Sequence, residues 1–433
     1  MARRKRVESI RRLVAVAALI ATAALIFLGV WMAFSLLRPT PPRSASLAVG
    51  PEGSFDAEVA KLYRDLLARN GIDLKLVPTD GAVQAVSRLN DPKSGISIAI
   101  VPGGITNQQQ SPDLVSLGTL YYEPLWIFSR RQSLAKHEEL RSLRISIGPE
   151  GSASRALSLE FLSRVGIIDE KSTTLLSFTP QESAEKLLKG EIDAAILMGA
   201  WETPVVQRLL TATDTHLATI QRADAFVALY PYLNKLVLPA GVADMTNNRP
   251  PVDVLLVAPK ASLVVRGDLH PAIQYLLLEA ASQIHAGPGV FRAAGQFPAS
   301  ESIDLPLSTH ARQFYKTGSP FLQRNLPFWL AVIIQQALVV LIPVVGLLYP
   351  LLQISPRVFA WIERRRVYKL YSALRLLEEE LASADSRQAG KDFIRRLDQL
   401  EEQACRLWLP SSLRPLLYDL RLHIGMIRDE TRK

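Results

Sequence analysis

Two long runs without a charged residue constrain this chain more than any other feature of its sequence. Residues 13–37 form 25 consecutive uncharged residues, and residues 326–354 form a second such run of 29. As helices, both runs are long enough to cross the ~30 Å hydrocarbon core of a bilayer. The sequence therefore predicts two transmembrane helices, with a short Pro-rich linker at 38–45 and a large domain at 46–325 between them.

The distribution of charge predicts how these helices are oriented. The 433-residue chain has a formal net charge of +9, and its basic residues crowd into the segments next to the two runs, 1–12 and 355–433. By the positive-inside rule both segments are cytoplasmic and the large domain lies outside the cytoplasm. The stretch 39–325 holds 27 basic and 28 acidic residues. It has no basic excess that would favour a nucleic-acid partner.

A cleaved signal peptide is the alternative for the first run, because its basic start is typical of one. The apolar part is longer than the usual core of a signal peptide, and no clear A-x-A cleavage motif follows, so an uncleaved anchor is favoured. The single cysteine, Cys405, falls in the cytoplasmic segment. The outer domain therefore contains neither a disulfide nor a thiolate metal site.

The outer domain contains the five-residue sequence GPEGS twice, at 50–54 and at 148–152. Each copy follows a short apolar run and precedes a helical pattern. Each copy thus lies between the first strand and the first helix of the same order of strand, helix, strand, helix and strand, with apolar third strands at 96–102 and 192–198. This pattern predicts an α/β fold with two βαβαβ units, each built on a parallel sheet with helices on both faces.

Two such units predict a two-lobed clamshell with a cleft where the carboxyl ends of their strands meet. We expect lobe I at about 46–135 and 250–300 and lobe II at about 140–245. In the returning segment, VDVLLVAP and SLVV are predicted as two strands, followed by a helix, so that the chain crosses back to complete lobe I. Such crossings act as hinges in two-lobed proteins.

The repeated loops provide the first candidate binding residues. Unpaired N–H groups and the positive end of the helix dipole make a Gly-rich loop at a helix start suitable for an anion. Simple capping of each helix is the alternative role for the serines. Arg155, in the first turn of the second helix, is either a carboxylate clamp or a solvated side chain beside Glu160. The candidates from these loops are Gly53, Ser54, Gly151, Ser152, Ser154 and Arg155.

Other loops at predicted strand ends add further candidates, namely TDGA (79–82), PGG (102–104), GTLYYEPLW (118–126) and MGAW (198–201). Aromatic residues there either close over a ligand or belong to the core. Glu123, just before Pro124, either binds an ammonium group or ends a strand. The ligand-binding candidates from these loops are Thr79, Gly81, Gly103, Tyr122, Gly199 and Trp201.

Signatures of enzymes and of nucleotide sites are missing from the sequence. Neither GPEGS copy continues as a Walker A loop or as G-x-G-x-x-G. The six histidines show no H-x-x-x-H or H-E-x-x-H spacing, and no G-x-S-x-G elbow occurs. We therefore expect binding without catalysis, with no cofactor and no metal.

The sequence resembles the TAXI class of TRAP-transporter solute-binding proteins. This class is related to the NMT1-like family of type II periplasmic binding proteins. The resemblance covers about residues 45–370 and rests on stretches such as GPEGSASRALSLEFLSRVGI, KLLKGEIDAAILMG, PAGVAD and PFLQRNLPFW. The last two resemble a membrane-anchored subgroup. The resemblance implies a clamshell that binds small organic acids or amino acids and delivers them to a TRAP-type permease.

Two loops depart from the pattern of that class. Its second loop usually reads Gly-Ser-x-Thr, whereas Gly151–Ser154 ends in serine. The T-G-G-S of many members is TDGA at 79–82, which loses a hydroxyl and gains an acid. The identity of the ligand therefore does not carry over from the class, although a small anionic solute remains the expected partner.

The cytoplasmic segment 355–433 shows apolar spacing typical of amphipathic helices. These helices suit contact with a permease, with a second copy or with the inner leaflet. The expected function is a membrane-tethered solute-binding subunit of a transporter. The alternative is a ligand sensor that signals through its cytoplasmic helices to a separate partner, because the segment is too short for a kinase domain.

Overall fold

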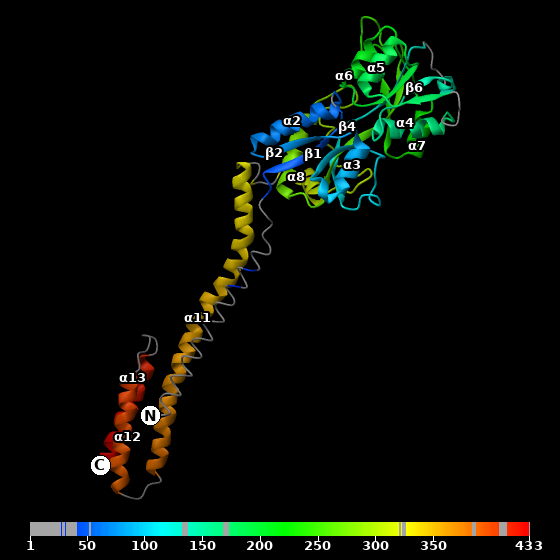
Figure 1. Ribbon diagram of the computed structural model, residues 1–433. Coiled ribbons are helices and arrows are strands. Elements are labelled where there is room, and N and C mark those ends of the chain that lie inside the picture. The colour runs from blue at the N-terminus through cyan, green and yellow to red at the C-terminus, as the bar shows by residue number, and fades with distance from the viewer. Residues whose placement is uncertain are drawn as a thin grey trace. The chain divides into compact units, whose positions relative to one another are not determined.

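The structure is a computed structural model that describes residues 27, 31, 41–51, 53–131, 137–167, 173–319, 322, 326–382, 387–406 and 414–432. The chain divides into two compact units, Pro39–Gln335 and a second unit made of Met1–Arg38 with Gln336–Lys433. Each unit is described by itself. The unit Pro39–Gln335 holds both lobes of the α/β fold (Figure 1).

The first sheet has six strands in the order β10-β11-β3-β1-β2, with β4 also paired to β11. Lobe I is built on this sheet except for β10 and the first half of β11, which pack in the cores of lobe II. The pairs β1–β2 and β1–β3 are parallel, whereas β11 runs antiparallel to β3, β4 and β10. The strands are β1 (Ser44–Val49), β2 (Asp73–Pro78), β3 (Ile98–Pro102), β4 (Leu114–Tyr122), β10 (Leu233–Leu238) and β11 (Val254–Arg266).

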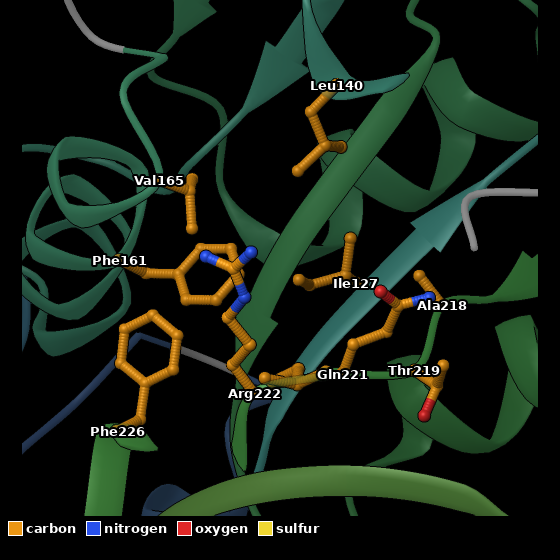
Figure 2. Close-up of a pocket in the computed structure, with 10 residues that line it drawn as sticks. Ile127, Leu140, Phe161, Val165, Ala218, Thr219, Gln221, Arg222 and Phe226 are labelled. Atoms are coloured by element: carbon orange, nitrogen blue, oxygen red, sulfur yellow. The ribbon is translucent and has the colours of Figure 1, made fainter. Parts of the chain in front are cut away.

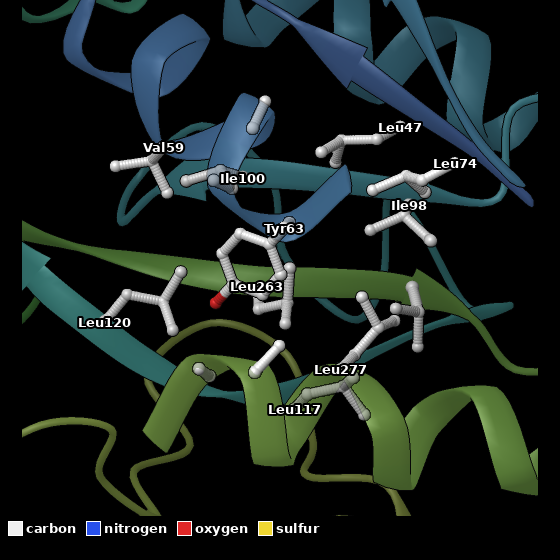
Figure 3. Close-up of a cluster of buried hydrophobic side chains, with 14 of the residues drawn as sticks. Leu47, Val59, Tyr63, Leu74, Ile98, Ile100, Leu117, Leu120, Leu263 and Leu277 are labelled. Carbon is white, nitrogen blue, oxygen red and sulfur yellow. The ribbon is translucent and has the colours of Figure 1, made fainter. Parts of the chain in front are cut away.

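Helices cover both faces of this sheet, as the apolar strands predicted. On one face, α2 (Phe55–Arg69), α8 (Pro271–His285) and α9 (Thr309–Thr317) enclose a core that includes Tyr63 and Leu263. Figure 3 shows Tyr63 on its helix among side chains of the sheet and of α8. On the other face, α3 (Ala82–Asn90) packs over a second core. Lobe I is therefore a three-layer structure.

Lobe II repeats the arrangement on a sheet in the order β7-β6-β8-β5-β9. In it β6 pairs in parallel with β7 and β8, just as β1 pairs with β2 and β3 in lobe I. The predicted repeat of two βαβαβ units is confirmed. Its elements are β5 (Leu125–Ser129), β6 (Arg144–Ser146), α4 (Ala153–Arg164), β7 (Thr174–Leu176), α5 (Pro180–Lys189), β8 (Ala194–Met198), α6 (Pro204–Thr211), β9 (His216–Leu217) and α7 (Ala223–Leu229).

The two segments that join the lobes differ from the prediction. VDVLLVAP and SLVV form one continuous strand of 13 residues, β11, whose first half pairs with β10 and whose second half pairs with β3 and β4. Pro259 does not end this strand, because it lies opposite Leu233 at the start of β10, where a missing donor is tolerated. The expected loop 118–126 is also mostly strand, at the end of β4 and the start of β5.

The chain therefore crosses between the lobes at two adjacent points. One crossing is Glu123–Pro124, between β4 and β5, and the other is the middle of β11. The backbone N–H of Glu123 donates a 3.0 Å hydrogen bond to the carbonyl of Pro259, which ties the two crossings together. The expected return of the chain to lobe I is confirmed, because α8 packs in the lobe I core.

The spacing of Val59, Leu62, Tyr63, Leu66 and Leu67 predicts one apolar face for the first helix of the outer domain, and the structure differs at one of these positions. Val59, Tyr63 and Leu67 of α2 are buried, whereas Leu62 is 51% exposed. Small residues, Ala57 and Ala60, take its place against the sheet, since α2 lies close to the strands.

The second unit contains a helical core made by the part of α11 (Phe328–Ala382) that follows Gln335, α12 (Arg387–Cys405) and α13 (Arg414–Arg432). Val367, Leu374 and Leu377 pack with Phe393 and Leu397 and with residues of α13. The predicted amphipathic helices are present.

Within the part of the chain that the structure describes, no helix combines the length and the apolarity needed to cross a membrane. The first predicted span, 13–37, lies outside the described residues except for Phe27 and Trp31, as does the basic segment 1–12. The second, 326–354, lies mostly in α11.

Candidate functional site

Each GPEGS loop ends at the start of a helix. Ser54 is the N-cap of α2 and accepts a hydrogen bond from the N–H of Ala57 at 3.3 Å. Ser152 is the N-cap of α4 and accepts from the N–H of Arg155 at 3.1 Å. The fourth residue of each copy has nearly the same left-handed backbone, with φ of +79° at Gly53 and +80° at Gly151. The local conformation of the two loops is thus repeated.

A cavity of about 100 Å³ lies between the lobes, at these two helix starts. Its walls come from the first turn of α2, the loop before α3, the first turn of α4, the end of β8 and the start of α6. Seven predicted site residues line it: Gly53, Ser54, Thr79, Gly81, Ser152, Ser154 and Gly199. Residues that lie far apart in the sequence meet here.

Direct contacts between loops of the two lobes border the cavity. The N–H of Val83, in α3, donates a 3.1 Å hydrogen bond to the carbonyl of Gly151. A Cβ atom on Gly81, where φ is +141°, would lie only 2.7 Å from the Cα of Ser152. Lobe II also reaches the first loop, since a Cβ on Gly53 would collide with the amide of Gln181. The lobes are closed on each other at this edge.

Three of the lining hydroxyl groups hold the walls in place. Thr79 donates to the carbonyl of Val49 at 2.9 Å, and Ser154 donates to the carbonyl of Ile196 at 3.2 Å. Ser152 donates to the carbonyl of Pro149 at 2.7 Å while it caps α4. Their protons are already used within the protein, so these hydroxyls mainly fix the shape of the cavity.

Arg155 and Gly151 do not line the cavity. The guanidinium of Arg155 donates to the hydroxyl of Ser177 at 2.7 Å and to the carbonyl of Gly148 at 3.5 Å. It therefore braces the second GPEGS loop against the loop after β7, and the predicted carboxylate clamp is not formed. The carbonyl of Gly151 instead accepts the hydrogen bond from the N–H of Val83 that joins the two lobes.

Gly103, Tyr122 and Trp201 lie away from the cavity as well. Gly103 is next to Tyr232 and Asp304. Tyr122 packs edge-on against Phe297, at 5.4 Å between ring centroids, because β4 directs this side chain away from the cavity. Trp201 joins an aromatic cluster with Trp126 and Phe291, the alternative that the sequence left open.

Sequence reasoning missed Thr203, the N-cap of α6. Its side chain is only 6% exposed, lines the cavity and makes no capping hydrogen bond, and its hydroxyl has no partner among the described residues. A buried hydroxyl without a partner costs about 1–3 kcal/mol. The first N–H groups of α6, at Val205 and Val206, which also line the cavity, lack intrahelical partners by helix geometry.

Two carboxyl groups meet at the lobe I side of the cavity. Asp56, in the first turn of α2, accepts a 2.5 Å hydrogen bond from the hydroxyl of Tyr121. Glu123, which is 4% exposed, also hydrogen-bonds to Asp56, and both acids line the cavity. Sequence reasoning singled out Glu123 but missed Asp56, because its partners are distant in the sequence. No local signal distinguishes this aspartate from an ordinary acid at a helix start.

Burial governs the protonation of these groups. Burial raises the pKa of Glu123 well above its usual value, and the nearby charge of Asp56 raises it further. Burial also raises the pKa of Asp56, whereas the hydrogen bonds from Tyr121 and Glu123 act in the opposite direction. Behind Tyr121 lies His285, with 5.3 Å between ring centroids. Burial lowers the pKa of His285 to about 3, so it is neutral at physiological pH.

A second hollow, of about 30 Å³, lies within lobe II and is shown in Figure 2. Its lining is mainly apolar and includes Phe161 and Ile127, together with Gln221 and Arg222. All of its lining residues belong to lobe II, so it does not open on the contact between the lobes. We therefore take the cavity between the lobes as the candidate site.

Within the described ranges, no group of three or more His, Cys, Asp or Glu side chains is arranged to hold a metal ion.

Comparisons with known proteins give a family and several structures of low identity. The sequence profile of the NMT1-like family matches residues 57–317, more than half of the chain. The periplasmic aliphatic sulphonate binding protein SsuA from Escherichia coli is 17% identical, with a TM-score of 0.34 over 56% of this chain and 73% of that one. The lipoprotein Tp32 from Treponema pallidum is 15% identical, with a TM-score of 0.33 over 56% and 95%. A Xanthomonas citri protein bound to ATP is 17% identical, with a TM-score of 0.37 over 67% and 97%.

Proposed function

Because the chain belongs to the NMT1-like family, we propose that it is a membrane-tethered extracytoplasmic solute-binding protein that holds a small anionic metabolite between its lobes. The family consists of solute-binding proteins of the two-lobed periplasmic type, and not of enzymes. The metabolite is an organic acid or an amino acid. Its carboxylate would bind at the starts of α4 and α6, where the helix dipoles and unpaired N–H groups favour an anion.

One observation carries this proposal: the unpartnered hydroxyl of Thr203 lines a cavity whose walls come from both lobes. A hydroxyl in such a place lowers the stability of the empty protein, and a ligand that accepts its proton removes that cost. Contacts such as the hydrogen bond from Val83 to Gly151 then couple occupancy to lobe closure.

We further propose that the runs 13–37 and 326–354 tether this domain to the bacterial inner membrane, with both termini in the cytoplasm. The absence of charge in both runs and the basic residues beside them support this orientation. The solute would pass from the cavity to a TRAP-type permease. Tethering raises the effective concentration of the binding domain near such a permease.

The second candidate function is a ligand sensor. The observation that favours it is the packed core of the C-terminal helices, in which Leu374, Leu397 and Ile424 are buried. A folded cytoplasmic element of this kind can pass on a change in the outer domain to a separate protein. Pull-down of a permease subunit with the full chain favours transport, and pull-down of a kinase or regulator favours sensing.

A thermal-shift screen tests solute binding in the proposed cavity. The full-length chain is screened against organic acids and amino acids, beside a variant with a filled cavity, Ala82→Phe. Ala82 lines the cavity and is partly exposed, so the phenyl ring enters the cavity without overpacking a core. The control is Val83→Phe at a neighbouring position whose side chain is 40% exposed and does not line the cavity.

We expect a solute to raise the Tm of the wild type and of Val83→Phe, but not that of Ala82→Phe. An equal rise in all three proteins would show that the solute binds elsewhere and would contradict the proposal.

A further inference from the structure

The ionisable side chains that line the cavity are all acidic among the described residues. The lining includes three acids, Asp56, Asp80 and Glu123. Of the described residues that line the cavity, none is Lys, Arg or His. A site for a simple dicarboxylate needs a compensating cation, and this wall does not supply one.

Asp56 and Glu123 act as a unit with one negative charge. Because burial and the charge of Asp56 raise the pKa of Glu123 well above its usual value, we expect Glu123 to keep its proton and to donate it to the carboxylate of Asp56, which also accepts the hydrogen bond from Tyr121. A buried carboxyl group beside a partly buried one shares a proton with it, because both cannot ionise at low cost. The carboxylate of Asp56 is thus fixed in position by two donors, at the edge of the cavity.

The titratable groups around this pair do not neutralise it. Tyr121 keeps its proton, because burial raises its pKa well above the usual value, and Tyr63 behind it does the same. His285, which packs against both rings, is neutral. On the neighbouring strand, Lys260 is bound to Glu301, at 2.7 Å between Nζ and the carboxylate. The charge of Asp56 is therefore left for a cation within the cavity.

Lobe II contributes the opposite chemistry. The start of α6 offers the unpartnered hydroxyl of Thr203 and the N–H groups of Val205 and Val206. The start of α4 adds a second helix N-terminus at Ala153, which also lines the cavity. These groups favour an anion. One lobe thus presents a negative charge and the other presents donors for a carboxylate.

We propose that the ligand is a zwitterionic amino acid whose ammonium group binds the carboxylate of Asp56 and whose carboxylate binds at Thr203 and the adjacent helix starts. This inference rests on the proposed function, since it assumes that a solute occupies the cavity. It narrows the solute from organic acids in general to those with an amine. A ligand that spans both lobes also explains how binding holds them closed.

Matched pairs of compounds test the inference on the full-length chain. Each pair differs only in the amine: glutamate and glutarate, aspartate and succinate, leucine and 4-methylpentanoate. Binding is measured by thermal shift and then by calorimetry for the wild type and for two variants. Asp56→Asn removes the proposed ammonium partner. Asp65→Asn is the control, because Asp65 lies on the same helix as Asp56 but is exposed and does not line the cavity.

We expect an amine-bearing member to bind and its deaminated partner not to bind. Asp56→Asn should weaken binding by about 10- to 100-fold, through the loss of a charge-assisted hydrogen bond, and Asp65→Asn by less than about 3-fold. The inference would be overturned if both members of a pair bound equally, if Asp56→Asn left this binding unchanged, and if Ala82→Phe abolished it. The proposed function would stand in that case. Solute binding that also persists in Ala82→Phe would overturn both.

Discussion

The hydroxyl of Tyr121 donates a 2.5 Å hydrogen bond to the carboxylate of Asp56, and so connects the strand that crosses between the lobes to the first turn of α2. The Tyr121 ring packs edge-on against Phe55 at 4.9 Å, and its hydroxyl reaches the edge of the cavity. Through Tyr121, the lobe I core thereby fixes the position of the Asp56 carboxylate at the edge of the cavity. This strand, β4, ends at Tyr122, and the crossing at Glu123 follows directly.

Replacing Tyr121 with phenylalanine removes this donor and leaves the packing of the ring in place. We expect the free energy of unfolding to fall by about 1–3 kcal/mol, because a buried carboxylate loses a hydrogen bond. The pKa of Asp56 should rise, since that bond holds it down. Urea unfolding of the full chain measures the first effect. Tyr122→Phe is the control, because among the described residues the Tyr122 hydroxyl makes only a long hydrogen bond of 3.4 Å, with Gln296. Equal losses in both variants would contradict this role for Tyr121.

Replacing Glu123 with glutamine should change how stability depends on pH. The pKa of Glu123 is raised in the folded protein, so between its usual value of 4.5 and the raised value the folded state binds more protons than the unfolded state. Stability is then fully present below about pH 4.5 and is lost as the pH rises through the raised pKa. Glutamine cannot ionise and still donates to Asp56.

The Glu123→Gln variant should therefore match the wild type near pH 4.5 and exceed it at pH 8. Each gain of about 1 kcal/mol corresponds to roughly 2–4 °C in Tm for a domain of this size. Thermal melts of both proteins across this pH range measure the difference. A variant that is less stable than the wild type at pH 8 would show that Glu123 is ionised and stabilising.

Closure of the lobes depends on Gly81. Alanine at this position would place its Cβ 2.7 Å from the Cα of Ser152 in the other lobe, and backbone atoms do not move aside easily. We expect Gly81→Ala to weaken ligand binding by about 10-fold or more, because it opposes the closed form that the ligand stabilises. Calorimetry with the solute that gives the largest thermal shift measures the change.

Gly95→Ala controls for backbone strain, since Gly95 has a φ of +70° but an alanine Cβ at this position would have no atom within 4 Å. It should cost about 1 kcal/mol of stability and leave the affinity unchanged. If both variants lost the same affinity, the contact between Gly81 and Ser152 would have no part in closure.

The sequence predicted the elements that are set by local chemistry. The two GPEGS loops lie at equivalent helix starts because serine caps and left-handed glycines are local signals, and the order of strands follows from their apolar runs. The continuous strand β11 was missed because Pro259 is a strand breaker in most positions. It is tolerated here through its place opposite Leu233, the first residue of β10.

The site was less predictable than the fold, because its chemistry depends on distant partners. Arg155 lies beside the second loop in sequence, but its guanidinium turns to Ser177, a residue placed by the packing of β7 and α5. The importance of Asp56 depends on Tyr121 and Glu123, which the crossing strand brings to it. Thr203 is notable only because its hydroxyl lacks a partner among the described residues, a property of the packed structure.

The most direct test of solute binding between the lobes is the replacement of Thr203 by valine, with affinity and stability measured on the same full-length protein. The change removes the unpartnered hydroxyl and keeps the shape of the side chain. The control, Ser183→Ala, removes a buried hydroxyl that is paired with Ser146 at 2.7 Å and does not line the cavity. Ser183→Ala should lower the Tm and leave the affinity for the solute unchanged.

For Thr203→Val we predict the opposite pair of results. The Tm without ligand should be higher, because a buried hydroxyl that has no partner among the described residues is removed. The affinity for the solute should be about 10-fold weaker, because the ligand loses a hydrogen-bond donor. A higher Tm with unchanged affinity would mean that the solute does not reach Thr203, and would contradict the assignment of this cavity as the binding site.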